Sequence, residues 1–169
     1  MTVGTKDEAS RLRRGIRAYL LVFIVGLVLS GVTAFPLTPE VSLLARITDA
    51  SGLAGASPTL ATWLGTVQVA LSDTEVRHPF LFYGTDWLAF GHIIIALFFV
   101  GPLLDPVRNV FVLRAGVVAC ALVLPLAFVC GPIRGIPFWW QLIDCSFGVL
   151  GAIPLLLCIK SVRRLEAIA

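Results

Sequence analysis

The chain has 169 residues, of which 58% are hydrophobic and only 14% are charged, and its net charge is +3. Soluble domains are roughly 45–50% apolar and about 25% charged, so this composition excludes an ordinary soluble domain and favours an integral membrane protein. No basic patch is interleaved with aromatic residues, and we therefore do not expect nucleic acid as a partner.

Positions 1–17 are polar and basic, and an apolar stretch follows at 18–35. Basic residues beside a span mark the cytoplasmic side, so we predict a cytoplasmic N-terminus and a first transmembrane helix over 18–35. Gly26, Ser30 and Ala34 recur at intervals of four, which gives a face where another helix can approach closely. A cleaved signal peptide is the competing interpretation, although the apolar run exceeds the usual length of about 7–15 residues.

The segment 36–82 is the least hydrophobic long region, and it carries two signals for the start of a helix. These signals are the Thr-Pro and Ser-Pro pairs at 38–39 and 57–58, because proline is preferred at the first helical position. Apolar residues then recur at helical spacing. We predict two short amphipathic helices in an external loop, with a flexible break at 49–57. A structural cap is the favoured role, and a lid over a cavity is the alternative.

Three further apolar stretches predict transmembrane helices at 83–104, 110–130 and 138–159. A cytoplasmic turn at 105–109 follows the first of them, because a residue before proline is disfavoured in helical geometry. A tight external turn at 131–137 joins the other two. The sequence therefore predicts an all-α polytopic membrane protein with four transmembrane helices.

The basic residues indicate the orientation of these helices. With the N-terminal segment and the C-terminal segment 160–169 both in the cytoplasm, ten of the 13 Lys and Arg residues lie inside and three lie outside. This distribution follows the positive-inside rule. We therefore expect a plasma or inner membrane of the bacterial type, with the lipid bilayer as the immediate partner.

The four cysteines lie in apolar runs, and none forms a CxxC pair or a Cys/His cluster with zinc spacing. We expect them to be small buried hydrophobic side chains rather than a disulfide or metal ligands. They are Cys120, Cys130, Cys145 and Cys158.

Polar residues in the outer halves of the second and fourth spans form the candidate site. Helical rise of about 1.5 Å per residue places the Asp, His and Gln residues among them between about 6 and 15 Å below the outer ends of these spans. Ionisable groups near the membrane centre cost at least about 2.5–3.5 kcal/mol each, so they persist only when they are paired, hydrated or functional. The candidate ligand-binding residues are Asp86, His92, Trp140, Gln141 and Asp144.

Two interpretations of this cluster remain open. In the structural one, Asp144 accepts hydrogen bonds from Trp, Gln or His side chains and clamps the bundle, while Asp86 caps the second span. In the functional one, the pocket opens outward, His92 carries a proton near neutral pH, and Asp144 or Asp86 orients it. The catalytic candidates are therefore His92, Asp86 and Asp144. We expect no metal or cofactor, because ligand spacing for a metal and a second axial histidine for a b-type haem are both missing.

Three functions follow from these patterns. The leading hypothesis is a non-enzymatic structural or accessory bundle protein that associates with itself or with a larger membrane complex. It rests on the small-residue faces of the first and fourth spans. In the fourth span, Asp144, Gly148 and Ala152 align on one face, which we expect to contact protein rather than lipid. The alternative is an enzyme or binding protein for a lipid-like ligand. A small transporter is the weakest, because the first and third spans offer no polar pathway across the inner half.

Overall fold

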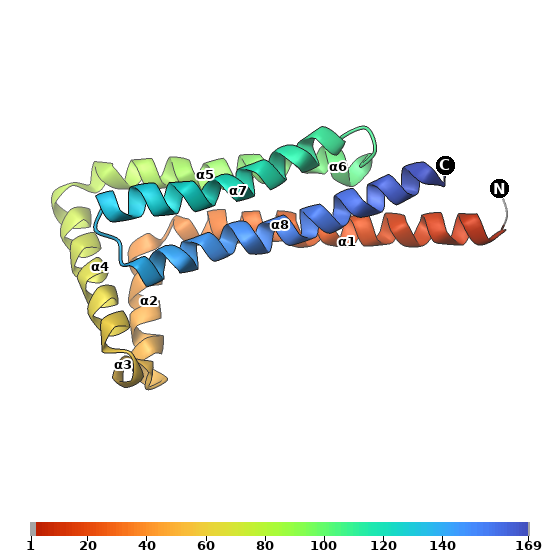
Figure 1. Ribbon diagram of the computed structural model, residues 1–169. Helices are drawn as coiled ribbons and strands as arrows, with labels where there is room; N and C mark the ends of the chain where they lie inside the picture. The colour runs from red at the N-terminus through yellow and green to blue at the C-terminus, as the bar shows by residue number, and fades with distance from the viewer. Residues whose placement is uncertain (1–2, 169) are drawn as a thin grey trace. The chain divides into compact units, whose positions relative to one another are not determined.

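The computed structural model of the chain describes residues 3–168, and within them every regular element is helical. Figure 1 shows these elements from the N-terminus to the C-terminus. In chain order they are α1 (Val3–Ala34), α2 (Leu37–Ala50), α3 (Leu53–Ala56), α4 (Pro58–Arg77), a 3-10 turn η1 (Pro79–Leu81), α5 (Phe82–Phe98), α6 (Val100–Leu104), α7 (Val110–Ile133) and α8 (Phe138–Ala167).

Four helical segments are long and apolar enough to cross a membrane: Asp7–Ala34, Pro79–Leu104, Val110–Ile133 and Phe138–Ala167. Their lengths of 28, 26, 24 and 30 residues exceed the roughly 20 residues that a bilayer requires. The predicted all-α fold with four transmembrane helices is thus confirmed. The basic N-terminal segment is itself helical from Val3, and its four arginines favour a helix.

The chain folds into two compact units, and each is described by itself. One unit contains Met1–Leu27 and Ile95–Ala169, and we call it the terminal unit. The other contains Val28–Ile94, and we call it the middle unit. Both α1 and α5 are single helices that contribute residues to each unit.

In the terminal unit, α7 and α8 pack along each other in opposite directions. Glycines allow this close approach, because an added Cβ at Gly148 would lie 2.5 Å from the carbonyl oxygen of Cys120. The prediction that the Gly148 face of the fourth span packs against protein is therefore confirmed. A buried apolar cluster extends from these helices to α1, where Leu20 is fully buried with Leu155 of α8.

Aromatic rings extend the core of the terminal unit. Phe23 of α1 and Phe99 lie with their ring centroids 4.6 Å apart and their planes tilted by 58°. Phe99 also fills the space beside Gly116 of α7, where an added Cβ would lie 2.7 Å from its ring. This packing places the start of α6 against both α1 and α7 within the unit.

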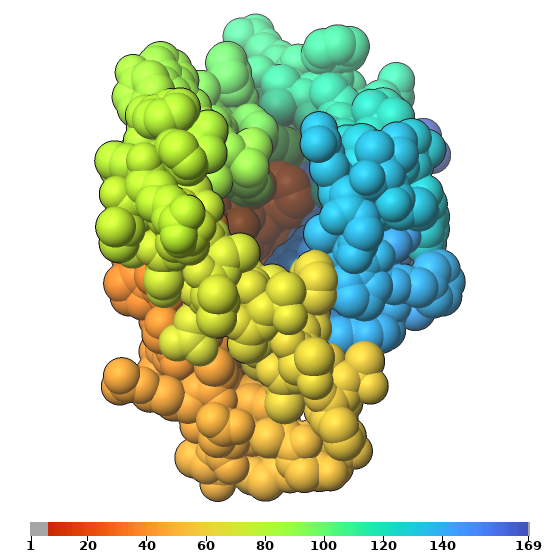
Figure 2. All heavy atoms as spheres, turned by 90° about the vertical axis from the view of Figure 1, so that its left-hand side faces the viewer, coloured from red at the N-terminus to blue at the C-terminus, as the bar shows by residue number. Residues whose placement is uncertain are grey.

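In the middle unit, α2 and α4 lie side by side, as the ribbon and the space-filling view both show (Figures 1 and 2). The side-chain amide of Gln68 donates to the hydroxyl oxygen of Ser42 across this pair, at 3.2 Å. The short helix α3 connects them, and Gly52 adopts φ +75° at the turn, a conformation that glycine accepts without strain. The segment 36–82 is thus helical as predicted, but the break predicted at 49–57 contains the end of α2 and the helix α3, and α4 is longer than the short helix that was expected.

The end of α1 packs against the first part of α5 in the same unit. A Cβ added at Gly31 would lie 2.7 Å from the carbonyl oxygen of Ala89 and 3.1 Å from the Cβ atom of His92. The close approach of α1 in this unit therefore uses Gly31. The predicted face at Gly26 is open instead, because no atom of the described chain lies within 4 Å of a Cβ built there.

Candidate functional site

The five predicted site residues are divided between the two units. Asp86 and His92 lie on α5 in the middle unit, and Trp140, Gln141 and Asp144 lie on α8 in the terminal unit. Each of these two groups is described within its own unit.

In the middle unit, His92 is hydrogen-bonded to its own helix. Its Nδ1 atom lies 2.8 Å from the carbonyl oxygen of Leu88. Because a carbonyl oxygen only accepts, the proton in this contact belongs to Nδ1, and Nε2 is left as the acceptor of the neutral ring. This contact orients the imidazole on its own helix, and it does not join α5 to another helix.

Asp86 is half-buried in the second turn of α5, which begins at Phe82. A residue at this position is too far into the helix to cap its first N–H groups, so the expected capping role is not met. Within the described part of the middle unit, its carboxylate has no hydrogen bond or ion pair. The neighbouring hydroxyl of Thr85 donates to the carbonyl oxygen of Phe82, at 2.7 Å.

In the terminal unit, Gln141 ties the turn between α7 and α8 to the first turn of α8. Its side chain is only 3% exposed, and its Nε2 atom donates to the carbonyl oxygen of Ile136 at 2.8 Å. The N–H of Ile136 in turn donates to the carbonyl oxygen of Gly131, at 2.9 Å. Gln141 also packs directly on Gly131, where no Cβ would fit. These contacts support the structural interpretation of Gln141.

Asp144 lines a recess of about 300 Å³ between α7 and α8. Arg134, from the turn, lines the same recess, and the remaining wall is largely apolar, with Val123, Leu126 and Ile136 among its residues. Asp144 is half-buried and has no hydrogen bond or ion pair within the described residues of its unit. Ligand pockets typically start at about 300 Å³ and combine apolar walls with a few polar groups, so this recess is at the lower limit.

Comparison with known protein families, curated proteins and solved structures finds no match to this chain. The chemistry of the site therefore rests on its own residues.

Aromatic residues occupy the start of α8, a few positions before Asp144 in the sequence. The rings of Trp139 and Trp140 meet edge to face, with centroids 5.6 Å apart and an angle of 78°. Phe138 stacks on Phe128 of α7, with centroids 6.1 Å apart. Such aromatic groups suit the interface between lipid and water.

No group of three His, Cys, Asp or Glu side chains among the described residues is close enough together to hold a metal ion. The arrangement that the structure does show is a carboxyl group and a guanidinium group, those of Asp144 and Arg134, at one apolar recess. It can bind a ligand that carries complementary polar groups on an apolar body.

Sequence reasoning missed Arg134 as a site residue, because it lies in the predicted external turn 131–137 and not in either of the spans that carry the candidates. The signal that could have found it is the tight turn itself. Gly135 adopts φ +69°, and a short turn of this kind returns its residues over the adjoining helix ends. A charged residue in so short a connection therefore stays close to Asp144, one to two turns into the next helix.

Proposed function

We propose that the protein is a non-enzymatic, integral membrane bundle protein that associates through its first span with a second copy or with a larger membrane complex. Its polar side chains in the spans serve mainly to hold the fold, as Gln141 does at the turn and His92 does on α5. The proposed location is a plasma or inner membrane with both termini in the cytoplasm, which follows from the distribution of basic residues.

The exposed small-residue face of α1 carries this proposal. Two other helical glycines face neighbours within the chain: Gly148 faces the carbonyl oxygen of Cys120, and Gly116 faces the ring of Phe99. Gly26 is different, because it is exposed and nothing in the described chain lies within 4 Å of a Cβ built there. Ser30, one turn further along α1, is exposed as well. Small residues four apart on an open face allow two membrane helices to approach closely.

The test of this association is the substitution Gly26→Leu. Two copies of the full chain carrying different affinity tags are co-expressed, membranes are solubilised in mild detergent, and one tag is captured while the other is measured. We expect co-capture of the original chain and a roughly tenfold reduction for Gly26→Leu, because a leucine there separates the two backbones.

Gly91→Leu is the matched control, since Gly91 also has nothing within 4 Å but lies on α5. Co-capture should persist in this variant. Equal co-capture of the Gly26 and Gly91 variants would show that the face of α1 is not the surface of association. If the original chain shows no co-capture, size analysis of the solubilised complex decides between a larger assembly and a monomer, and a monomer contradicts the proposal.

A second candidate function is supported by the recess at Asp144. A carboxylate that faces an apolar recess without a partner in its own unit is costly at membrane depth, unless a ligand or water satisfies it. The proposed ligand is lipid-like, with a polar group between Asp144 and Arg134 and its apolar part along Leu126 and Val123. In the first function the same residues contribute only to stability.

Asp144→Asn separates these two roles. The purified variant is compared with the original chain by thermal unfolding and by mass spectrometry of small molecules that co-purify. If the recess binds a ligand, a bound molecule disappears while the thermal stability holds or rises, because a charge that is costly to bury has been removed. Ser146→Ala is the control, as the Ser146 hydroxyl donates only to the carbonyl oxygen of Ile143 on its own helix. Lower stability with nothing bound to either form would leave the structural role alone.

A further inference from the structure

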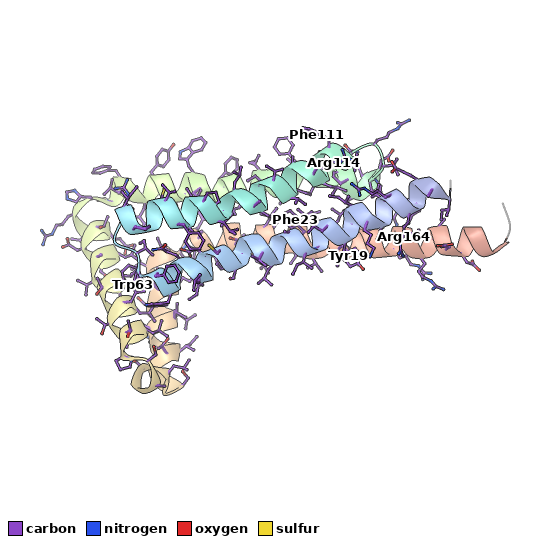
Figure 3. The ribbon with its side chains drawn as sticks, viewed as in Figure 1. Tyr19, Phe23, Trp63, Phe111, Arg114 and Arg164 are labelled. Carbon is purple, nitrogen blue, oxygen red and sulfur yellow. The ribbon has the colours of Figure 1, made fainter. Side chains whose placement is uncertain are left out.

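A second hollow in the terminal unit lies between α7 and α8 at the end that carries the C-terminus, and we call it the basic groove. Its volume is about 740 Å³. Four cationic side chains line it: Arg114 from α7, and Lys160, Arg163 and Arg164 from α8. Figure 3 shows Arg114 and Arg164 near the same end of this helix pair.

Helical spacing explains why these residues share one surface. The α8 residues of the groove include Leu156, Lys160 and Arg163, at intervals of four and three, so they lie on one face of the helix. Arg114 and Val118 of α7 are likewise four residues apart. Along the chain, the α8 residues change from apolar to basic, whereas the α7 residues change from basic to apolar. Because the two helices run in opposite directions, their basic ends coincide.

The groove therefore has a gradient of polarity along the helix axes. Its basic end lies toward the end of α8. Its other end is lined by Val118 and Leu156, which are 57% and 52% exposed. Both belong to helices that are long and apolar enough to cross a membrane, where exposed apolar side chains would contact acyl chains. This sequence of surfaces, cationic and then apolar along the membrane normal, matches a phospholipid with a negatively charged head group.

The positive charges of the groove have no acidic partner among the residues that the structure describes. No carboxylate lines the groove, and none of its four cations forms an ion pair with a described residue. Other arginines of the chain do form such pairs: Arg77 with Asp73 at 2.7 Å, and Arg108 with Asp105 at 3.6 Å. Four like charges around one hollow repel one another, and a bound phosphate would replace that repulsion with charge-assisted hydrogen bonds.

We propose that the basic groove binds one anionic phospholipid, with its phosphate between Arg114, Lys160, Arg163 and Arg164 and an acyl chain along Val118 and Leu156. Basic pockets between transmembrane helices recognise anionic head groups in this way. A zwitterionic lipid would bring its own cation into a site that already holds four. This inference goes beyond the proposed association, because it uses α7 and α8 and not the exposed face of α1.

The test uses the purified full-length chain in detergent and native mass spectrometry. Dioleoyl phosphatidylglycerol and dioleoyl phosphatidylcholine are added in separate titrations, and a third arm adds inorganic phosphate in excess. We expect phosphatidylglycerol to bind at least about tenfold more tightly than phosphatidylcholine, with the binding weakened by salt. Inorganic phosphate should compete only weakly, because it cannot use the apolar end of the groove.

Arg163→Gln together with Arg164→Gln should weaken the binding of phosphatidylglycerol roughly 10- to 30-fold, as two cations near the head group are lost. The matched control is Arg13→Gln with Arg14→Gln, which removes two adjacent, exposed arginines from α1 of the same unit and changes the net charge equally. This control should bind as the original chain does. Arg163→Lys with Arg164→Lys keeps the charge and should retain most of the binding, so a loss caused by misfolding is recognised.

Three results would overturn the inference. The first is equal affinity for the two lipids. The second is an equal loss of binding in the two arginine-to-glutamine variants, which would indicate a general charge effect rather than a site. The third is full competition by inorganic phosphate, which would indicate an anion site without a lipid chain.

Discussion

Gly148→Leu is expected to separate α7 from α8 and to lower the free energy of unfolding of the terminal unit by about 3 kcal/mol or more. A Cβ at this position already lies 2.5 Å from the carbonyl oxygen of Cys120 and 3.1 Å from the Cβ atom of Val123. Neither of these atoms can move without the backbone of α7. The measurement is thermal unfolding in detergent, with hydrogen exchange by mass spectrometry to locate the change in α7 and α8.

Gly91→Leu is the control for this variant, because it adds the same side chain where nothing lies within 4 Å of the Cβ. A leucine favours a helix over a glycine by up to about 1 kcal/mol, so this control should be neutral or slightly stabilising. If both variants unfold at the same temperature as the original chain, the packing of α7 on α8 through Gly148 is not as described.

Gly31→Leu should have a comparable effect in the middle unit. Its Cβ would lie 2.7 Å from the carbonyl oxygen of Ala89, which is fully buried, and 3.1 Å from a side-chain atom of Ile93. We expect a loss of about 3 kcal/mol in unfolding free energy, because the end of α1 is pushed away from α5. Faster hydrogen exchange at the end of α1 and in the first part of α5 is the measurement that checks it.

The location of the faster exchange distinguishes this variant from Gly148→Leu. The substitution at Gly31 should leave α7 and α8 protected, since those helices belong to the terminal unit. Gly91→Leu, in the same unit but with open space around its Cβ, is the control and should keep its protection throughout. Loss of protection in α7 as large as that in α5 would show that the two units do not open independently.

Much of the fold could be predicted from the sequence, because it depends on properties of single segments. The lengths of apolar stretches determine the spans, and Pro58 after Ser57 marks the start of α4, whereas α2 begins at Leu37, two residues before Pro39. The packing role of Gly148 was also predictable, since it lies in a row of small residues beside an acid that avoids lipid. Such features need only the periodicity of one helix.

The contacts of the candidate site could not be predicted, because they depend on which helix faces meet. Periodicity favoured Gly26 as the position where another helix approaches α1 closely. In the structure, α5 approaches α1 at Gly31 instead, which lies on a different face of the helix. Helical periodicity also placed Gln141 in a candidate ligand pocket, whereas in the structure the side-chain amide of Gln141 donates to the carbonyl oxygen of Ile136. Arg134 and the basic groove depend on α7 and α8 being neighbours, and no pattern within one helix contains that information.

The length of the terminal helices has a consequence for the region outside the bilayer. α1 has 32 residues and α8 has 30, which makes each about 45–48 Å long at about 1.5 Å per residue, against a hydrocarbon thickness of about 30 Å. Ile16 of α1 shares a buried cluster with Val162 and Leu165 of α8, so the projecting ends form a packed pair. This pair of helices is continuous with the transmembrane helices. A molecule that binds the pair outside the bilayer can therefore tilt or rotate the transmembrane helices without entering the lipid.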